Sequence, residues 1–183
     1  MRAVPTSILF VCTANQCRSP LAEAIARREA GGLPVWFASA GLLAGGHGVP
    51  PTGVKVAAEL GLDLSEHRST QVDYPALLGF DVVLTMTRAQ ARELVAAEPE
   101  LWPRVFTLKQ FSRWLNDHPR PSSGRLGSWL ATEAAERSSN ELLGSDPDDD
   151  VRDPLTSSAR VWRSVASELT DHIRAVLGTL FPA

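Results

Sequence analysis

Cys12 and Arg18 could act together on a phosphoryl group, because only five residues separate them. A thiol is a nucleophile as its thiolate, a form favoured beside cations and at helix N-termini. A guanidinium holds two phosphoryl oxygens in a planar fork, which the ammonium group of lysine does not do. The pair therefore predicts covalent catalysis by Cys12, with Arg18 as the phosphate-binding cation. A buried core cysteine near a solvated helix arginine is the alternative that these two residues alone leave open.

The elements on either side of this pair favour an anion site. Ile8–Val11 has the composition of a buried strand, and Ser19 and Pro20 suit the N-cap and first position of a helix. The intervening loop then points backbone N–H groups and the positive end of a helix dipole at one spot. Because these dipoles and Arg18 neutralise the phosphoryl oxygens, we expect neither a metal nor a cofactor. The residues expected to form the phosphate site are Thr13, Ala14, Asn15, Gln16, Cys17 and Ser19, with Ser19 hydrogen-bonded to Cys12.

Residues 12–20, Cys-Thr-Ala-Asn-Gln-Cys-Arg-Ser-Pro, closely resemble the phosphate-binding loop of low-molecular-weight protein tyrosine phosphatases. The resemblance continues in scattered form across most of the chain. It implies a protein tyrosine phosphatase that hydrolyses a phosphorylated protein, phosphotyrosine foremost, through a phosphocysteine on Cys12. It also implies a single phosphatase domain over residues 1–183.

Two further polar residues follow from the resemblance as supports of Asn15. Ser39–Leu42 resembles the family's Ser-Ala-Gly-Thr segment, in which the serine supports the loop asparagine. Leu64–Ser69 resembles its Leu-Ser-x-His-x-Ser/Ala segment, in which a buried histidine hydrogen-bonds the same asparagine. The resemblance therefore implies supporting roles for Ser39 and His67. Without it, Ser39 is a serine at a strand end and His67 a satisfied core or surface histidine.

A general acid is expected in the acidic stretch Ser145–Pro154, which contains two Asp-Pro pairs. The reaction needs one carboxyl group that protonates the leaving oxygen and then takes a proton from the attacking water. Asp146 and Asp153 both fit this role by residue type. Asp153 is preferred, because a capped helix is predicted to start soon after it, at residue 157 or 158, as in the family's Asp-Pro-Tyr arrangement.

Departures from the family pattern bear on the substrate. Leu155 stands where the family has Tyr or Phe, and the loop Leu42–Pro51 has no aromatic residue, so two walls that would stack on phosphotyrosine are missing. Gln16 is an uncommon polar residue at the loop position that faces the substrate. A protein arginine phosphatase is therefore an alternative. An arsenate reductase is less favoured, because reductases of this fold need a further pair of resolving cysteines, and a non-catalytic relative that binds phosphorylated partners is a third alternative.

Two residues near the site raise separate expectations. The family usually continues Met-Asp where this chain has Met86-Thr87, so one carboxylate beside the phosphate loop is expected to be missing. Cys17 follows Cys12 closely, and we hypothesise that peroxide joins them in a protective, reversible disulfide. The alternative is that Cys17 only packs beneath the loop.

Composition limits the classes of partner and compartment. The chain has 183 residues, of which 44% are hydrophobic, and this suits one compact domain. Its formal net charge of −3 argues against nucleic-acid binding, and no apolar stretch reaches the roughly 20 residues that span a membrane. Its two cysteines, both in the loop, favour a reducing compartment, so we expect a cytoplasmic protein. The sequence does not indicate an oligomeric state.

The rest of the chain alternates predicted strands and helices. Beyond the first strand and helix, strands are expected at Val35–Ala40, Phe80–Met86 and Arg104–Leu108, and helices at Thr52–Gly61, Arg88–Ala97, Lys109–Asn116, Ser128–Ala135 and Ala159–Leu180. This alternation predicts an α/β fold, an open parallel sheet with helices on both faces. The resemblance adds four strands in the order 2-1-3-4, a flavodoxin-like three-layer sandwich. Residues 118–144 form a variable segment, equally compatible with a partner-binding surface and a neutral insertion.

Overall fold

The sheet consists of parallel strands whose carboxyl ends meet at one edge. A computed structural model describes residues 5–121 and 124–182. Within it the strands are β1 (Thr6–Cys12), β2 (Val35–Gly41), β3 (Val82–Thr85) and β4 (Val105–Thr107). Their order is β2-β1-β3-β4, which confirms the expected 2-1-3-4 arrangement. Cys12 ends β1, the central strand at which the strand order reverses, and this is where open α/β sheets bind ligands.

The helices largely follow the predicted pattern. They are α1 (Arg18–Ala30), α2 (Pro51–Glu59), α3 (Tyr74–Leu77), α4 (Arg88–Ala97), α5 (Leu108–Asp117), α6 (Leu126–Glu133) and α7 (Ala159–Leu180), with 3₁₀ turns η1 (Pro99–Arg104) and η2 (Ser139–Leu142). The predicted bounds of α4 and α7 are confirmed. The elements α3, η1 and η2 were not predicted, because elements of four to six residues are too short to show a helical apolar period.

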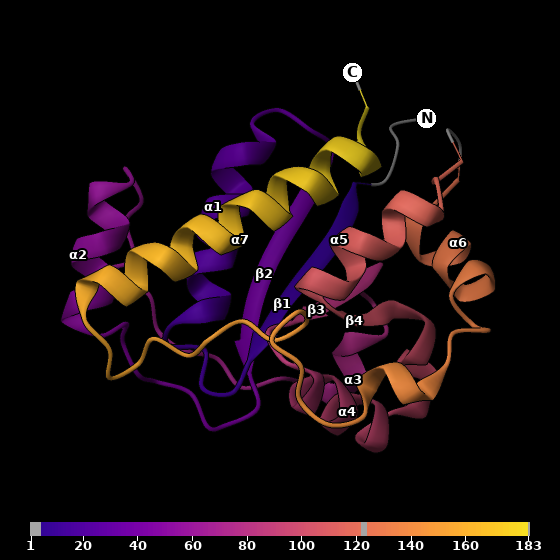
Figure 1. Cartoon of the computed structure of the whole chain (residues 1–183), viewed down its shortest axis with the longest axis horizontal. Helices are drawn as coiled ribbons and strands as arrows, with labels where there is room; N and C mark the ends of the chain where they lie inside the picture. The colour runs from indigo at the N-terminus through magenta and orange to yellow at the C-terminus, as the bar shows by residue number, and fades with distance from the viewer. Residues whose placement is uncertain (1–4, 122–123, 183) are drawn as a thin grey trace.

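Alternate residues of β1 supply the two cores of the sandwich. Ile8 and Phe10 face a cluster that includes apolar residues of α1, α5 and α7, whereas Leu9 and Val11 face one that includes residues of α3 and α4. Figure 1 shows the long helix α7 (yellow) lying beside α1 across the sheet. Helices therefore cover both faces of the sheet, and loops follow the strands at their carboxyl edge.

Part of the variable segment lies against the edge strand β4. Arg137 donates 2.7 Å hydrogen bonds to the carbonyls of Val105 and Trp102, and its guanidinium stacks 3.5 Å above the ring of Phe106. Burial lowers the pKa of Arg137 to about 10, which leaves it a cation at neutral pH. The segment thus supplies a charged donor to one backbone carbonyl of the edge strand. Residues 122 and 123 of the predicted segment lie outside the described residues.

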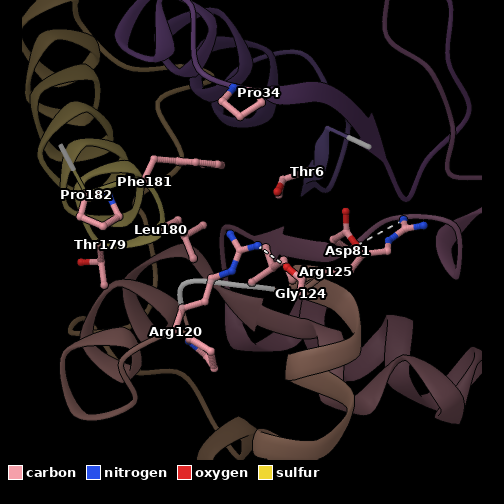
Figure 2. A pocket seen from close by; sticks show the side chains of 12 residues that line it. Thr6, Pro34, Asp81, Arg120, Gly124, Arg125, Thr179, Leu180, Phe181 and Pro182 are labelled. Carbon is pink, nitrogen blue, oxygen red and sulfur yellow. Dashed lines mark hydrogen bonds and ion pairs between the residues drawn. The ribbon is translucent and has the colours of Figure 1, made fainter. Parts of the chain in front are cut away.

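A wide cavity lies at the opposite end of the sheet from Cys12. It measures about 710 Å³ and is lined by residues that begin or precede strands, such as Thr6, Pro34 and Asp81, together with the end of α7. Figure 2 shows Asp81 and Arg125 paired at its wall. This cavity contains neither Cys12 nor Arg18. Among the described residues, no helix is both long and apolar enough to cross a membrane.

Candidate active site

The loop between β1 and α1 places the hydroxyl of Ser19 against Cys12. Ser19 Oγ lies 3.0 Å from Cys12 Sγ, accepts a hydrogen bond from the Asn15 amide at 2.9 Å, and lies 3.2 Å from the Ala40 carbonyl. The prediction of Ser19 as the N-cap is wrong: α1 begins at Arg18, and Cys17 is the cap residue. The Ser19 hydroxyl contacts loop and strand residues and does not cap the helix N–H groups.

Cys12 is almost fully buried, with 2% of its surface exposed. Its sulfur accepts a hydrogen bond from the Asn15 backbone N–H at 3.2 Å, in addition to the contact with Ser19. Both cysteines are free thiols. Cys12 is therefore held by two hydrogen-bonding contacts at the end of β1 and the start of the loop.

Cys17 has a different environment from Cys12. Burial raises the pKa of the Cys17 thiol to about 12, and the negative charges of Asp153 and Cys12 act in the same direction. Cys17 therefore stays protonated at neutral pH and is a poor nucleophile. Of the two thiols in the loop, the environment disfavours Cys17 for attack on phosphorus.

Asn15 ties the loop to the segments beside it. It adopts a left-handed backbone conformation with φ of 51°, which asparagine tolerates better than most residues. Its amide donates to Ser39 Oγ at 2.9 Å, and its side-chain oxygen accepts from the Thr70 N–H at 2.9 Å. His67 Nε2 lies 2.8 Å from the backbone carbonyl oxygen of Asn15. Because a carbonyl oxygen only accepts hydrogen bonds, Nε2 carries the proton in this contact. The structure thus brings both residues implied by the resemblance into contact with Asn15.

Gly41 allows β2 to pass directly behind the loop. A Cβ atom at this position would lie 2.7 Å from the Asn15 backbone nitrogen and 2.8 Å from the Ala14 carbonyl carbon. Real Cβ atoms do not approach backbone that closely, so any larger residue would push the loop away from the strand. The short distance between Ser39 and Asn15 therefore depends on glycine at position 41.

Arg18 joins the loop to the acidic stretch. One terminal nitrogen of its guanidinium donates to the Val151 carbonyl at 3.1 Å, and the other donates to Asp153 Oδ2 at 2.6 Å. Its Nε is buried and has no hydrogen-bond partner among the described residues. A buried donor without a partner is unfavourable, and one oxygen of a bound phosphoryl group would satisfy it. Arg18 can therefore bind the acidic stretch and a phosphoryl ligand at the same time.

Asp153, and not Asp146, reaches the loop. The Asp153 side chain is 48% exposed and accepts a second hydrogen bond from the Leu155 N–H at 3.1 Å. Asp146 instead pairs with Arg88 at 3.2 Å, away from Cys12. A small cavity joins these elements; its lining residues are Cys12, Ala14, Gln16, Cys17, Arg18, Asp153 and Leu155. No aromatic side chain is among the described residues that line it.

The other predicted loop residues do not line this cavity. Asn15 and Ser19 are buried, and Thr13 is exposed, with its hydroxyl facing α4. There it accepts a 3.0 Å hydrogen bond from Gln90, whose side-chain oxygen in turn accepts from the N–H groups of Met86 and Thr87. Gln90 is not among the predicted site residues. Thr87 and Gln90 form a capping box that sequence could have signalled, but the link to Thr13 spans 77 positions.

Comparison with known proteins gives the same picture over the first two thirds of the chain. A family model described as low molecular weight phosphotyrosine protein phosphatase matches residues 7–120, which include Cys12, Arg18, Ser39 and His67. A probable low molecular weight protein-tyrosine-phosphatase of Ralstonia solanacearum, EpsP, is 38% identical over 113 residues. That match covers 62% of this chain and 77% of EpsP.

Solved structures extend the similarity beyond residue 120. A low molecular weight protein tyrosine phosphatase from T. tengcongensis aligns with a TM-score of 0.71 and 29% identity, covering 94% of this chain and 97% of that one. The YwlE arginine phosphatase from Geobacillus stearothermophilus also gives 0.71 and 29%, covering 96% and 93%. The structural similarity therefore includes most of the region that follows the family-model match.

Proposed function

Since this chain belongs to the low-molecular-weight phosphotyrosine protein phosphatase family, we propose that it hydrolyses phosphorylated protein side chains through a phosphocysteine on Cys12. The observation that carries this proposal is the meeting of Cys12, Arg18 and Asp153 in one cavity, although 135 positions separate Arg18 from Asp153. A thiol, a phosphate-binding cation and a carboxyl group are the groups that the reaction needs.

In the first step the Cys12 thiolate attacks phosphorus, and the S–P bond forms as the P–O or P–N bond to the leaving group breaks. Arg18 Nε and the loop N–H groups hold the phosphoryl oxygens, whose charge is spread in the transition state. Asp153, as the general acid, gives its proton to the leaving atom. Its hydrogen bond to Arg18 places the acid beside the phosphate-binding cation.

In the second step water replaces Cys12 on phosphorus. Asp153, now a carboxylate, takes a proton from that water, and the S–P bond breaks to release inorganic phosphate. The hydroxyl of Ser19, 3.0 Å from Cys12 Sγ, can donate to the departing thiolate. Asn15, Ser39 and His67 act by holding the loop in place, through the contacts described above.

Phosphotyrosine is the substrate that the family favours, and phosphoarginine is a second candidate with an observation of its own. The cavity wall includes Ala14, Gln16 and Leu155, and no aromatic ring is among its described lining residues to stack on a phenol. The Gln16 side chain offers an amide oxygen that can accept from a guanidinium N–H. An arsenate reductase is less supported, because Cys17 is the one other cysteine in the sequence and burial keeps it protonated.

The test is hydrolysis of p-nitrophenyl phosphate under reducing conditions by the wild type and by Cys12→Ser. We expect turnover in the wild type and none in the variant, because a serine alkoxide is not available at neutral pH. A wild type that binds phosphate without turnover would instead identify a non-catalytic binding protein. Initial rates on matched phosphotyrosine and phosphoarginine peptides then decide the substrate class.

A further inference from the structure

Basic side chains from α4 and α5 surround the stretch that leads to Asp153. They are Arg88, Arg92, Lys109 and Arg113, and we call them the basic clamp. Each of them donates to backbone carbonyls of residues 142–148: Arg92 to Leu142 and Gly144, Arg88 to Leu143, Lys109 to Pro147 and Arg113 to Asp148. Hydrogen bonds from charged donors are stronger than those between neutral groups. The stretch is therefore fixed along its length by two helices.

The Asp149 carboxylate is the centre of this arrangement. Only 1% of its side chain is exposed, and it accepts hydrogen bonds from Arg88, from Arg113 and, at 3.0 Å, from Gln110. A buried carboxylate is stable only when charged or polar partners surround it. Asp149 is thus bound to the start of α4 and to the middle of α5 at once.

Two of the three residues between Asp149 and Asp153 are anchored to the rest of the protein. The Arg88 N–H donates to Asp150 Oδ1 at 2.7 Å, and the Val151 N–H donates to the Met86 carbonyl at 2.8 Å. The carbonyl of Val151 accepts from Arg18. Asp153 itself is half-exposed and is held only by Arg18 and the Leu155 N–H among the described residues. Its position therefore depends on the anchored residues before it.

We propose that Asp149 and the basic clamp are positioning residues that hold Asp153 at the distance needed for proton transfer. This inference rests on the proposed role of Asp153 as general acid. Proton transfer requires donor and acceptor within hydrogen-bond reach, so a loosened loop lowers the rate of that transfer without removing the thiol or the phosphate site. A poor leaving group, which needs its proton in the transition state, is affected more than a good one.

The main test variant is Arg113→Ala, because Arg113 is 51% exposed and its removal leaves Arg88 and Gln110 on Asp149. The matched control is Arg174→Ala, which removes a 61%-exposed arginine from its pair with Glu29 at the far end of α1 from Arg18. The readout is kcat/KM, which reports formation of the phosphocysteine, for phenyl phosphate and for p-nitrophenyl phosphate.

We expect Arg113→Ala to lower kcat/KM about tenfold for phenyl phosphate and less than about threefold for p-nitrophenyl phosphate. The tenfold loss is smaller than the rate factor of roughly 10²–10⁴ that a general acid contributes, because the acid itself is still present. Arg113→Lys, which keeps a charged donor, should restore most of the loss. Arg174→Ala should behave as the wild type on both substrates. Asp149→Asn should reproduce the selective loss more strongly, provided that its circular dichroism spectrum matches that of the folded wild type.

Asp153→Asn separates this inference from the proposed function. It should show the largest selective loss, and Arg113→Ala should add little to it in the double variant, because the acid is already absent. If Asp153→Asn affects both substrates equally, the general-acid assignment falls. If Asp153→Asn is selective while Arg113→Ala behaves as Arg174→Ala, the assignment stands and the positioning role of the clamp is overturned.

Discussion

Arg18 donates one hydrogen bond to the Asp153 carboxylate and another to the carbonyl of Val151, two residues earlier. The phosphate-binding cation thus also connects the acidic stretch Ser145–Pro154 to the loop between β1 and α1. Because its Nε has no partner in the described structure, a phosphoryl oxygen can bind there without breaking either contact. Arg18 can therefore both bind the substrate's phosphoryl group and hold Asp153 in place.

Arg18→Lys should lower kcat/KM by about 10²-fold or more, although the positive charge is kept. A lysine ammonium cannot contact a phosphoryl oxygen, the Val151 carbonyl and Asp153 in the same geometry, and loss of one such transition-state contact costs about this much. Steady-state kinetics on p-nitrophenyl phosphate measure the effect. A variant within threefold of the wild type would show that a point charge is sufficient.

Gly41→Ala should destabilise the fold by about 1–3 kcal/mol and reduce turnover, because the new Cβ would lie 2.7 Å from the Asn15 nitrogen. Gly178→Ala is the control, since a Cβ there meets nothing within 4 Å and α7 should gain up to about 1 kcal/mol. Urea unfolding followed by tryptophan fluorescence measures both. Equal stability of the two variants would contradict the tight passage of β2 behind the loop.

Peroxide should inactivate the enzyme reversibly by joining Cys12 and Cys17. Because burial raises the pKa of Cys17 to about 12, the step in which Cys17 attacks oxidised Cys12 should accelerate as the pH rises through the neutral and mildly alkaline range. Activity regained on addition of dithiothreitol, with mass spectrometry of the bridged peptide, is the measurement. Recovery that is unchanged in Cys17→Ala would rule out the disulfide.

Arg137→Ala should lower the free energy of unfolding by about 1.5–3 kcal/mol, the range for hydrogen bonds from a charged group, because two carbonyls lose their donor. Arg163→Ala, which removes an exposed ion pair with Glu59, should lower it far less, because solvent screens an exposed pair. Denaturant unfolding compares the two. Neither variant should alter kcat, because both arginines lie outside the cavity that contains Cys12.

The local part of the site could be predicted from the sequence, and the long-range part could not. Cys12 and Arg18 share one loop, so their spacing carries the information. Ser39 and His67 required the resemblance, because nothing in a lone serine or histidine indicates contact with Asn15. The contacts of Gln90 and Asp149 join elements tens of residues apart and have no pattern along the chain. The wrong prediction for Ser19 has the same origin. Its hydroxyl contacts residues brought near by the fold, which N-cap preferences do not take into account.

The contacts of Arg137 with β4 also bear on self-association. An uncovered edge strand can pair with the same strand of another copy, and long β ladders between copies lead to aggregates. In this chain the partly buried Arg137 side chain, from the variable segment, already donates to the carbonyl of Val105 in β4. A chain without Arg137 would leave that carbonyl open to a donor from another copy.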